Sequence, residues 1–392
     1  MALLHLPLDA IIEQYLRDLI QTGARESLYI DYKRETYGGN DAARREFLAD
    51  ICSFANAGGG DIVIGMAEGE GVKKGVAIDI VPFKGSADDE LRRLEQMARD
   101  GIEPRIIGLA VRIVPVSGGV VLVVRIPKSY NPPHRVAFQG SKRFYARSSG
   151  GRYEPNVEEL RNLFLAAPHL HERIRAFRME RIARIAAGET PVALYKGSPG
   201  RAVLHIVPYS AFGGSDPYLI RKLEKNWQFF PPFARENATF HEVNFEGFVT
   251  LRNYAEDPSE HASYCQVFRH GALEAVNYIN PDDVYSQSAF YHYFMPRILD
   301  SVFRLTNALA RCDIAPPYVV MFSLLNTPRS NSRAPTALRS AHQDQYHFIE
   351  AYLETTPEST EAAAQPLIPL FDHIASLSGA ISSGIEPKPT SP

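Results

Sequence analysis

Hydrophobic and polar positions in the first 165 residues switch repeatedly between helical and strand spacing. Phe47, Ile51 and Phe54 recur at helical spacing, whereas residues 62–66 form a nearly continuous apolar run that is typical of a strand buried on both faces. The same reasoning predicts helices within 10–21, 41–57, 88–99 and 156–165, and strands at 28–33, 62–66, 112–116, 120–126 and 143–147. This order of elements predicts a mixed α/β domain over residues 1–168.

The second half of the chain has the pattern of a different domain. Strand patterns occur at 192–195, 202–208, 242–251, 262–269, 272–277 and 317–324, and helical patterns at 286–310 and 343–353. We therefore predict an α+β domain of unknown role over residues 191–354. Residues 355–392 are polar and rich in alanine at their start, which indicates a flexible tail with one short helix around Phe371.

A basic helix and linker over residues 169–190 are predicted to join the two domains. Arg175, Arg178, Arg181 and Arg184 fall three residues apart along this helix. Such a stripe is more often a solvated face than a contact with nucleic acid or a second subunit.

Composition narrows the class of protein. The 392 residues carry a formal net charge of −3, so any nucleic-acid binding must use a local basic surface. Cys52, Cys265 and Cys312 lie far apart, which excludes a cysteine-rich zinc site and argues against a disulfide framework. Neither a signal peptide nor a membrane span is apparent, and we expect a cytoplasmic protein without membrane contact.

Acidic side chains gather near two predicted strands. Glu26, Asp31 and Lys33 surround the first strand, and Glu68 follows the strand at 62–66. If these strands share a sheet, the three carboxylates can converge on Mg²⁺ or Mn²⁺, which prefer oxygen ligands. Lys33 could then orient a phosphate. The alternative is a set of solvated carboxylates at strand ends.

Several segments in this order resemble the motifs of the Schlafen AlbA-like family. Glu26 to Lys33 resembles its E-x4-[E/D]-[F/Y]-K opening, and Ser53 to Gly65 resembles a helix ending in A-N-x-x-G-G followed by a strand ending in I-G. The sequences Asn131-Pro132-Pro133-His134 and Phe144 to Gly150 resemble its closing motifs. The resemblance covers roughly residues 15–165 and implies an AlbA-like α/β fold.

The nuclease members of that family cleave transfer and ribosomal RNA at a site of three acids. The resemblance assigns Glu26 and Asp31 to two of them. The third acid belongs to a G-V-D-D-like turn, where this chain reads Gly65-Met66-Ala67-Glu68. Either Glu68 serves as the third acid or the site is incomplete.

Basic and aromatic residues are interleaved in the closing part of the first domain. We predict that Lys128, Lys142, Arg143, Tyr145 and Arg147 contact nucleic acid, with cations on phosphates and an aromatic ring on a base. By resemblance the partner is RNA rather than DNA. The alternative is an ordinary hairpin with a polar face.

Gly58 to Gly60 follow a helix rather than open one, and no GxxxxGK[ST] motif exists, so we expect no ATP site. The leading hypothesis is a metal-dependent endoribonuclease that acts on structured, tRNA-like RNA, with a role in bacterial defence by analogy. The alternative is a non-catalytic regulator or sensor that binds nucleic acid or a nucleotide. The second domain would sense a trigger, regulate, or form a homodimer.

Overall fold

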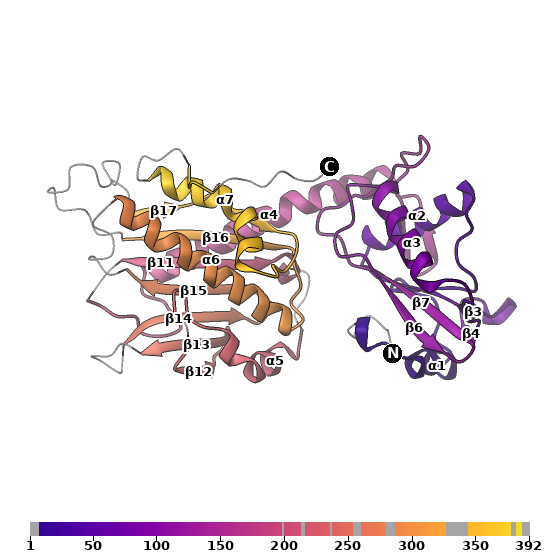
Figure 1. Ribbon diagram of the computed structural model, residues 1–392, viewed down its shortest axis with the longest axis horizontal. Helices are drawn as coiled ribbons and strands as arrows, with labels where there is room; N and C mark the ends of the chain where they lie inside the picture. The colour runs from indigo at the N-terminus through magenta and orange to yellow at the C-terminus, as the bar shows by residue number, and fades with distance from the viewer. Residues whose placement is uncertain are drawn as a thin grey trace. The chain divides into compact units, whose positions relative to one another are not determined.

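A computed structural model describes residues 8–197, 200–212, 216–235, 237–253, 260–279, 287–326, 344–377 and 382–385. The chain folds as two compact units, Met1–His169 and Leu170–Pro392, which are described separately (Figure 1). Both units combine helices with a sheet. The predicted mixed α/β first domain and sheet-containing second domain are confirmed.

A four-stranded sheet forms the centre of the first unit. Its strand order is β1-β2-β7-β6, and only the pairing of β1 with β2 is parallel. The strands are β1 (Ile30–Lys33), β2 (Gly60–Ile64), β6 (Ala110–Val116) and β7 (Gly119–Ile126). β2 is buried along its whole length, as its apolar sequence predicts.

Helices cover both faces of this sheet. α2 (Asp41–Ala55) and α3 (Ala87–Gly101) share a core with one face, and α1 (Glu13–Gln21) packs on the other. The side chain of Asn40 accepts a hydrogen bond from the backbone N–H of Ala43 and caps α2. The start of α2 is thereby fixed directly after the loop that follows β1.

Three short two-stranded ribbons complete the first unit. They are β3 (Met66–Glu68) with β4 (Ala77–Ile80), β5 (Ile102–Glu103) with β8 (Arg135–Val136), and β9 (Ala146–Ser148) with β10 (Gly151–Tyr153). The ribbon β9–β10 contacts α2 and brings the closing sequence motif beside it.

The two helices predicted at 156–165 and 169–185 are a single helix, α4 (Val157–Ala186), with Pro168 inside it. Proline has no N–H, so residue 168 cannot donate the usual helical hydrogen bond to the carbonyl of Phe164, four residues earlier. The prediction of a solvated arginine stripe is also wrong in part, because Arg178 and Arg181 are buried.

An antiparallel sheet dominates the second unit, in the order β12-β13-β14-β15-β11-β16-β17, with β18 also paired to β16. The strands are β11 (Arg201–Pro208), β12 (Phe240–Val243), β13 (Gly247–Asn253), β14 (His261–Phe268), β15 (Leu273–Tyr278), β16 (Tyr318–Leu325), β17 (Gln345–His347) and β18 (Ala351–Leu353).

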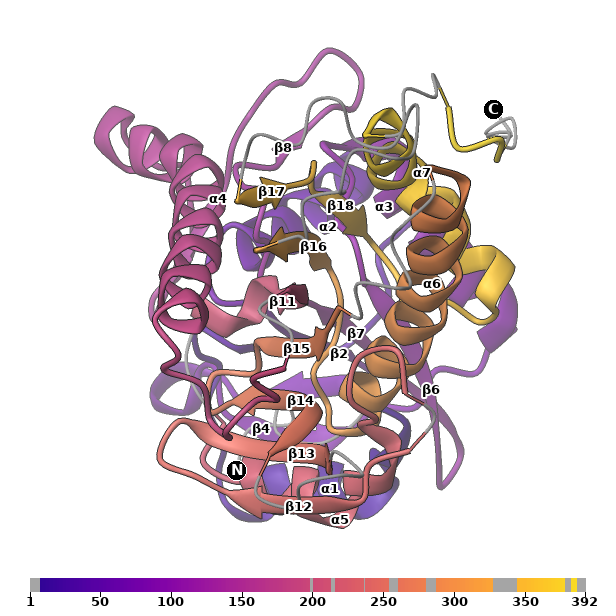
Figure 2. The ribbon, with the colours of Figure 1, turned by 90° about the vertical axis from the view of Figure 1, so that its left-hand side faces the viewer.

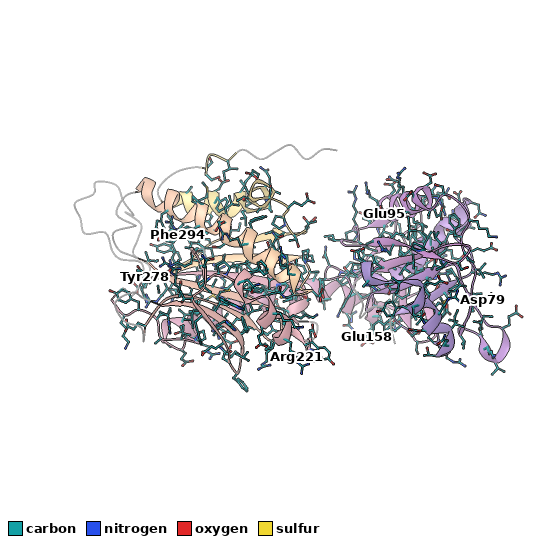
Figure 3. The ribbon with its side chains drawn as sticks, turned by 60° about the horizontal axis from the view of Figure 1, so that its bottom comes forward. Asp79, Glu95, Glu158, Arg221, Tyr278 and Phe294 are labelled. Atoms are coloured by element: carbon teal, nitrogen blue, oxygen red, sulfur yellow. The ribbon has the colours of Figure 1, made fainter. Side chains whose placement is uncertain are left out.

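Helices lie on both faces of the larger sheet. α6 (Gln287–Arg311) and α7 (Thr360–Ser376) cover one face, with the short α5 (Leu219–Lys225) at its edge, and the part of α4 from Leu170 onward covers the other (Figure 2). Figure 3 adds the side chains to the ribbon and labels Phe294 of α6, which is buried in the core of the second unit.

Two predictions for the end of the chain are wrong. Residues 343–353 are not a helix but contribute β17 and β18, which pair with β16. The tail predicted to be flexible over 355–392 contains α7, which includes the helix predicted around Phe371 but begins at Thr360 and is capped by the Ser359 side chain. Residues 378–381 and 386–392 of this tail lie outside the described residues.

Candidate functional site

Asp31 lies on β1 with its carboxylate buried among basic side chains. Arg147 Nη2 is 2.6 Å from Asp31 Oδ1, and Lys33 Nζ is 2.9 Å from Asp31 Oδ2. Arg147 also donates to the backbone carbonyl of Ser27 and lies over the ring of Phe54 at 4.1 Å. Asp31 Oδ1 therefore accepts a hydrogen bond from Arg147, whereas Oδ2 contacts the Lys33 ammonium as an ion pair and, within the described part of the chain, has no hydrogen-bond partner.

Asp50 is a second buried acid at the same place, and it was not predicted from the sequence. Its carboxylate accepts from Tyr37 Oη at 2.8 Å and from Arg152 Nη1 at 2.5 Å, and Lys33 Nζ lies 3.5 Å away. Lys33 thus bridges the carboxylates of β1 and α2. Burial lowers the pKa of Lys33, but the charges of Asp50 and Asp31 outweigh it, and the net shift is upward.

A signal for Asp50 does exist in the sequence. Phe47, Ile51 and Phe54 form the apolar stripe of α2, and Asp50 falls on the same face, three residues after the first of them. A carboxylate at a core position of a helix requires a buried partner.

Glu26 and Glu68 meet on either side of Gly75. The N–H of Glu26 donates to the carbonyl of Gly75, and the N–H of Gly75 donates to Glu68 Oε2 at 2.7 Å. Glu26 Oε1 accepts from the N–H of Tyr32 at 2.8 Å. Burial, followed by the charge of Asp31 and then that of Glu68, raises the pKa of Glu26. The three predicted acids therefore share one neighbourhood.

This neighbourhood does not fit a divalent cation as it is arranged. No group of three or more His, Cys, Asp or Glu side chains in the described part of the chain is placed to hold a metal ion. Asp31 is already paired with two cations, and one oxygen of Glu26 and one of Glu68 accept from backbone N–H groups. A hard cation that bound Asp31 would have to share its carboxylate with Lys33 and Arg147 or displace one of them.

The second sequence motif has a structural role. Asn56, directly after α2, donates to the carbonyls of His134 and Tyr145 and accepts from the N–H of His134. A Cβ on Gly59 would come within 2.5 Å of the backbone nitrogen of Lys128, and its φ of +75° favours glycine. The motif thus holds the closing segments against the end of α2.

The five residues predicted to contact nucleic acid differ in accessibility. Lys128 and Lys142 are exposed, and Arg143 is exposed while paired with Glu154 at 2.7 Å. Tyr145 is half-buried. Arg147 was predicted to grip the nucleic-acid backbone, but its side chain is only 3% exposed because it pairs with Asp31 beneath the surface.

The second unit contains a buried charge cluster between α4 and the sheet. Glu274 on β15 accepts from Arg181 Nε and Nη2, both at 2.9 Å, and from Tyr264 Oη at 2.8 Å. His205 Nε2 lies 3.1 Å from the same carboxylate. Burial would raise the pKa of Glu274, but the hydrogen bonds from His205 and Arg181 lower it to about 2. This cluster fixes α4 to the sheet.

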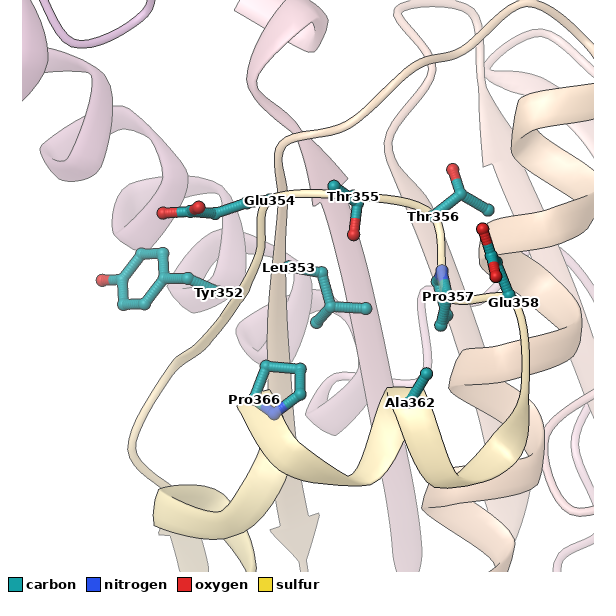
Figure 4. Close-up of a pocket in the computed structure, with 9 residues that line it drawn as sticks. All are labelled: Tyr352, Leu353, Glu354, Thr355, Thr356, Pro357, Glu358, Ala362 and Pro366. Carbon is teal, nitrogen blue, oxygen red and sulfur yellow. The ribbon is translucent and has the colours of Figure 1, made fainter. Parts of the chain in front are cut away.

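An open pocket of about 530 Å³ lies in the second unit between the segment after β18 and the first turns of α7 (Figure 4). Glu354, Glu358, Thr355 and Thr356 contribute its polar groups, and Pro366 is part of its apolar wall.

Within the described ranges, none of the helices combines the length and apolar character needed to cross a bilayer.

Comparisons with known proteins agree with the motifs of the first unit. The family model described as Schlafen, AlbA_2 matches residues 26–156. No curated protein matches the chain. A solved structure of the N-terminal domain of a RecG-related protein from Nitrosomonas europaea is 20% identical with a TM-score of 0.29, and the match covers 38% of this chain and 94% of that chain.

A second solved structure, the DIP2311 protein from Corynebacterium diphtheriae, is 11% identical with a TM-score of 0.27. That match covers 94% of this chain, which spans 62% of the DIP2311 chain. Taken with the motifs and the α/β fold of the first unit, the family match identifies residues 26–156 as a Schlafen AlbA_2 domain.

Proposed function

We propose that the AlbA_2 domain binds nucleic acid through a basic surface and does so without a divalent cation. The observation that carries this proposal is the state of Asp31, whose two oxygens contact Arg147 and Lys33. In these contacts the Asp31 carboxylate acts as a structural counter-ion for two basic side chains. Family membership supports a nucleic-acid-related role for the domain.

The surface available for this binding includes the exposed side chains of Lys128, Lys142 and Arg143. Exposed cations bind phosphates by releasing condensed counter-ions, which makes the affinity depend steeply on salt. By the family resemblance the preferred partner is structured RNA of the transfer-RNA type. The second unit would act as a sensor or regulator of the domain, and a defence role would fit this arrangement by analogy.

A second candidate is metal-dependent endoribonuclease activity, as the nuclease members of the family show. One observation favours it: Glu26 and Glu68 both bond to Gly75, and Glu26 Oε1 accepts from the N–H of Tyr32, the residue after Asp31, so the three acids lie in one region. In this alternative Glu26, Asp31 and Glu68 would hold Mg²⁺ or Mn²⁺, which would polarise the phosphodiester.

Fluorescence anisotropy tests the binding proposal. A labelled transfer RNA is titrated with the full chain in EDTA, and unlabelled transfer RNA, single-stranded DNA and duplex DNA compete. We expect binding in EDTA and the most effective competition from RNA. Equal competition by all three would remove the preference for RNA, and no binding of any of them would remove the proposal.

Cleavage is tested separately by incubating the same RNA with the protein and Mn²⁺ and resolving the products on a denaturing gel. The control is Asp31→Ala. Cleavage by the wild type that is lost in Asp31→Ala would establish the second candidate. Intact RNA, or equal cleavage by both proteins, would exclude it.

A further inference from the structure

Five charged side chains from four elements meet beside the end of β1. Lys33 and Asp31 come from β1, Asp50 from α2, Arg147 from β9 and Arg152 from β10. They form one connected network, since Arg147 pairs with Asp31, Arg152 pairs with Asp50, and Lys33 pairs with both acids. Three cations and two carboxylates leave the network with one net positive charge.

The two signs of charge are not equally accessible. The side chains of Asp31 and Asp50 are 9% and 5% exposed, and that of Arg147 is 3% exposed. Lys33 and Arg152, by contrast, are 27% and 31% exposed. A ligand that approaches from solvent therefore meets an ammonium group and a guanidinium group, with the carboxylates beneath them.

Asp50 is the link between these two exposed cations. Arg152 Nη1 also donates to the carbonyl of Glu46 on α2, which fixes the guanidinium against the helix. A guanidinium carries five N–H donors and an ammonium carries three, so both groups keep donors for a further acceptor. Two cations held side by side with spare donors suit the oxygens of a phosphate.

We infer that Asp50 is a positioning residue that holds Lys33 and Arg152 as a pair of phosphate ligands for the nucleic-acid backbone. The inference rests on the proposed function and adds a site to it. Lys33 lies between the carboxylates of Asp31 and Asp50 and contacts both. The exposed Glu46 lies near Lys33 and opposes phosphate binding there.

The test measures how the affinity for the labelled transfer RNA changes with salt, in EDTA and with the full chain. Each lost phosphate contact reduces the slope of log K against log[salt] by about one. We expect a slope that is shallower by about one in Lys33→Met and in Arg152→Met, and by about two in Asp50→Asn. Glu46→Gln should bind more tightly than the wild type.

Asp61→Asn is the matched control. Asp61 on β2 is a fully buried acid that forms a two-point ion pair with Arg125, and it lies outside the network. Asp50, by comparison, makes one contact with Arg152 and one with Lys33. Its loss should lower stability and leave the salt slope at the wild-type value. Circular dichroism and the thermal midpoint of each variant report whether it is folded.

The outcomes separate the two proposals. If the wild type binds RNA but Lys33→Met and Arg152→Met keep its salt slope, the positioning role is refuted and nucleic-acid binding stands. The positioning role is likewise refuted if Asp61→Asn flattens the slope as much as Asp50→Asn does. A wild type that binds no RNA refutes both proposals. If Asp50→Asn does not fold, the two methionine variants decide the question.

Discussion

Each buried aspartate described in the AlbA_2 domain is paired with at least one basic side chain. Asp31 pairs with Arg147, Asp50 with Arg152 and Asp61 with Arg125, and Lys33 pairs with both Asp31 and Asp50. Removing one partner of a buried pair leaves an uncompensated charge, whereas an exposed pair contributes little. The free energy of unfolding should therefore fall much more when a partner of a buried ion pair is removed than when an exposed ion pair is broken.

Arg147→Met tests whether a buried ion pair matters more to stability than an exposed one. The variant leaves Asp31 with Lys33 alone, and we expect the free energy of unfolding to fall by about 3 kcal/mol. Urea denaturation followed by circular dichroism measures the change. In Arg143→Met, which breaks the exposed pair with Glu154, the loss should be much smaller. Equal losses in the two variants would contradict the account.

At Glu26 we expect the removal of a charge to stabilise the domain, in contrast to the loss of stability expected for Arg147→Met. Its pKa is raised by burial and by Asp31, so its favourable contribution is present below pH 4.5 and is lost as the pH rises through the folded-state pKa. Glu26→Gln keeps an oxygen to accept from Tyr32 and removes the charge. We expect a higher thermal midpoint than the wild type at pH 7 in EDTA, and a smaller difference near pH 4.

A lower midpoint of Glu26→Gln at pH 7 would mean that the ionised carboxylate is useful to the fold. Such a result would favour a cation at this position and the nuclease candidate.

At the scale of elements, α4 is held to the sheet of the second unit by the ion pair of Arg181 with Glu274. The pKa of Glu274 is lowered to about 2 from 4.5, so its contribution is present above pH 4.5 and is lost as the pH falls through 2. This shift corresponds to about 3 kcal/mol. The second unit should therefore lose stability progressively on acidification.

Glu274→Gln should be much less stable than the wild type at pH 7, and the difference should shrink as the pH approaches 2. Denaturation in urea at several pH values measures it. Tyr264→Phe removes one hydrogen bond to the same carboxylate and keeps the ion pair, so its smaller loss should vary less with pH. A constant difference between Glu274→Gln and the wild type would contradict the assignment.

Local patterns predict the central strands and the covering helices of the first unit, but they miss the short strands β3, β4, β5, β8 and β10. Asn40 begins α2 and the apolar run of β2 is central in its sheet, as the sequence indicates. The predictions fail where secondary structure depends on residues that are distant in the sequence. Residues 345–347 and 351–353 become strands only because β16 offers them hydrogen-bond partners, which no local pattern reveals.

On the scale of the whole molecule, motif order predicts the domain, and the family match at residues 26–156 confirms it. The roles within the site are harder to predict. The sequence places Glu26, Asp31 and Glu68 in one region, but it does not indicate that Arg147 folds back from β9 onto Asp31, since the two are joined only by tertiary structure. The nuclease site thus stays a prediction.

The central claim is that this domain binds nucleic acid with its own cations. Its most direct test is the dissociation constant of the transfer RNA, measured in the same buffer with EDTA and with Mn²⁺. The account predicts nearly equal affinity in the two conditions, a steep dependence on salt and intact RNA after the titration. Binding that requires Mn²⁺ and is abolished in Asp31→Ala would contradict it.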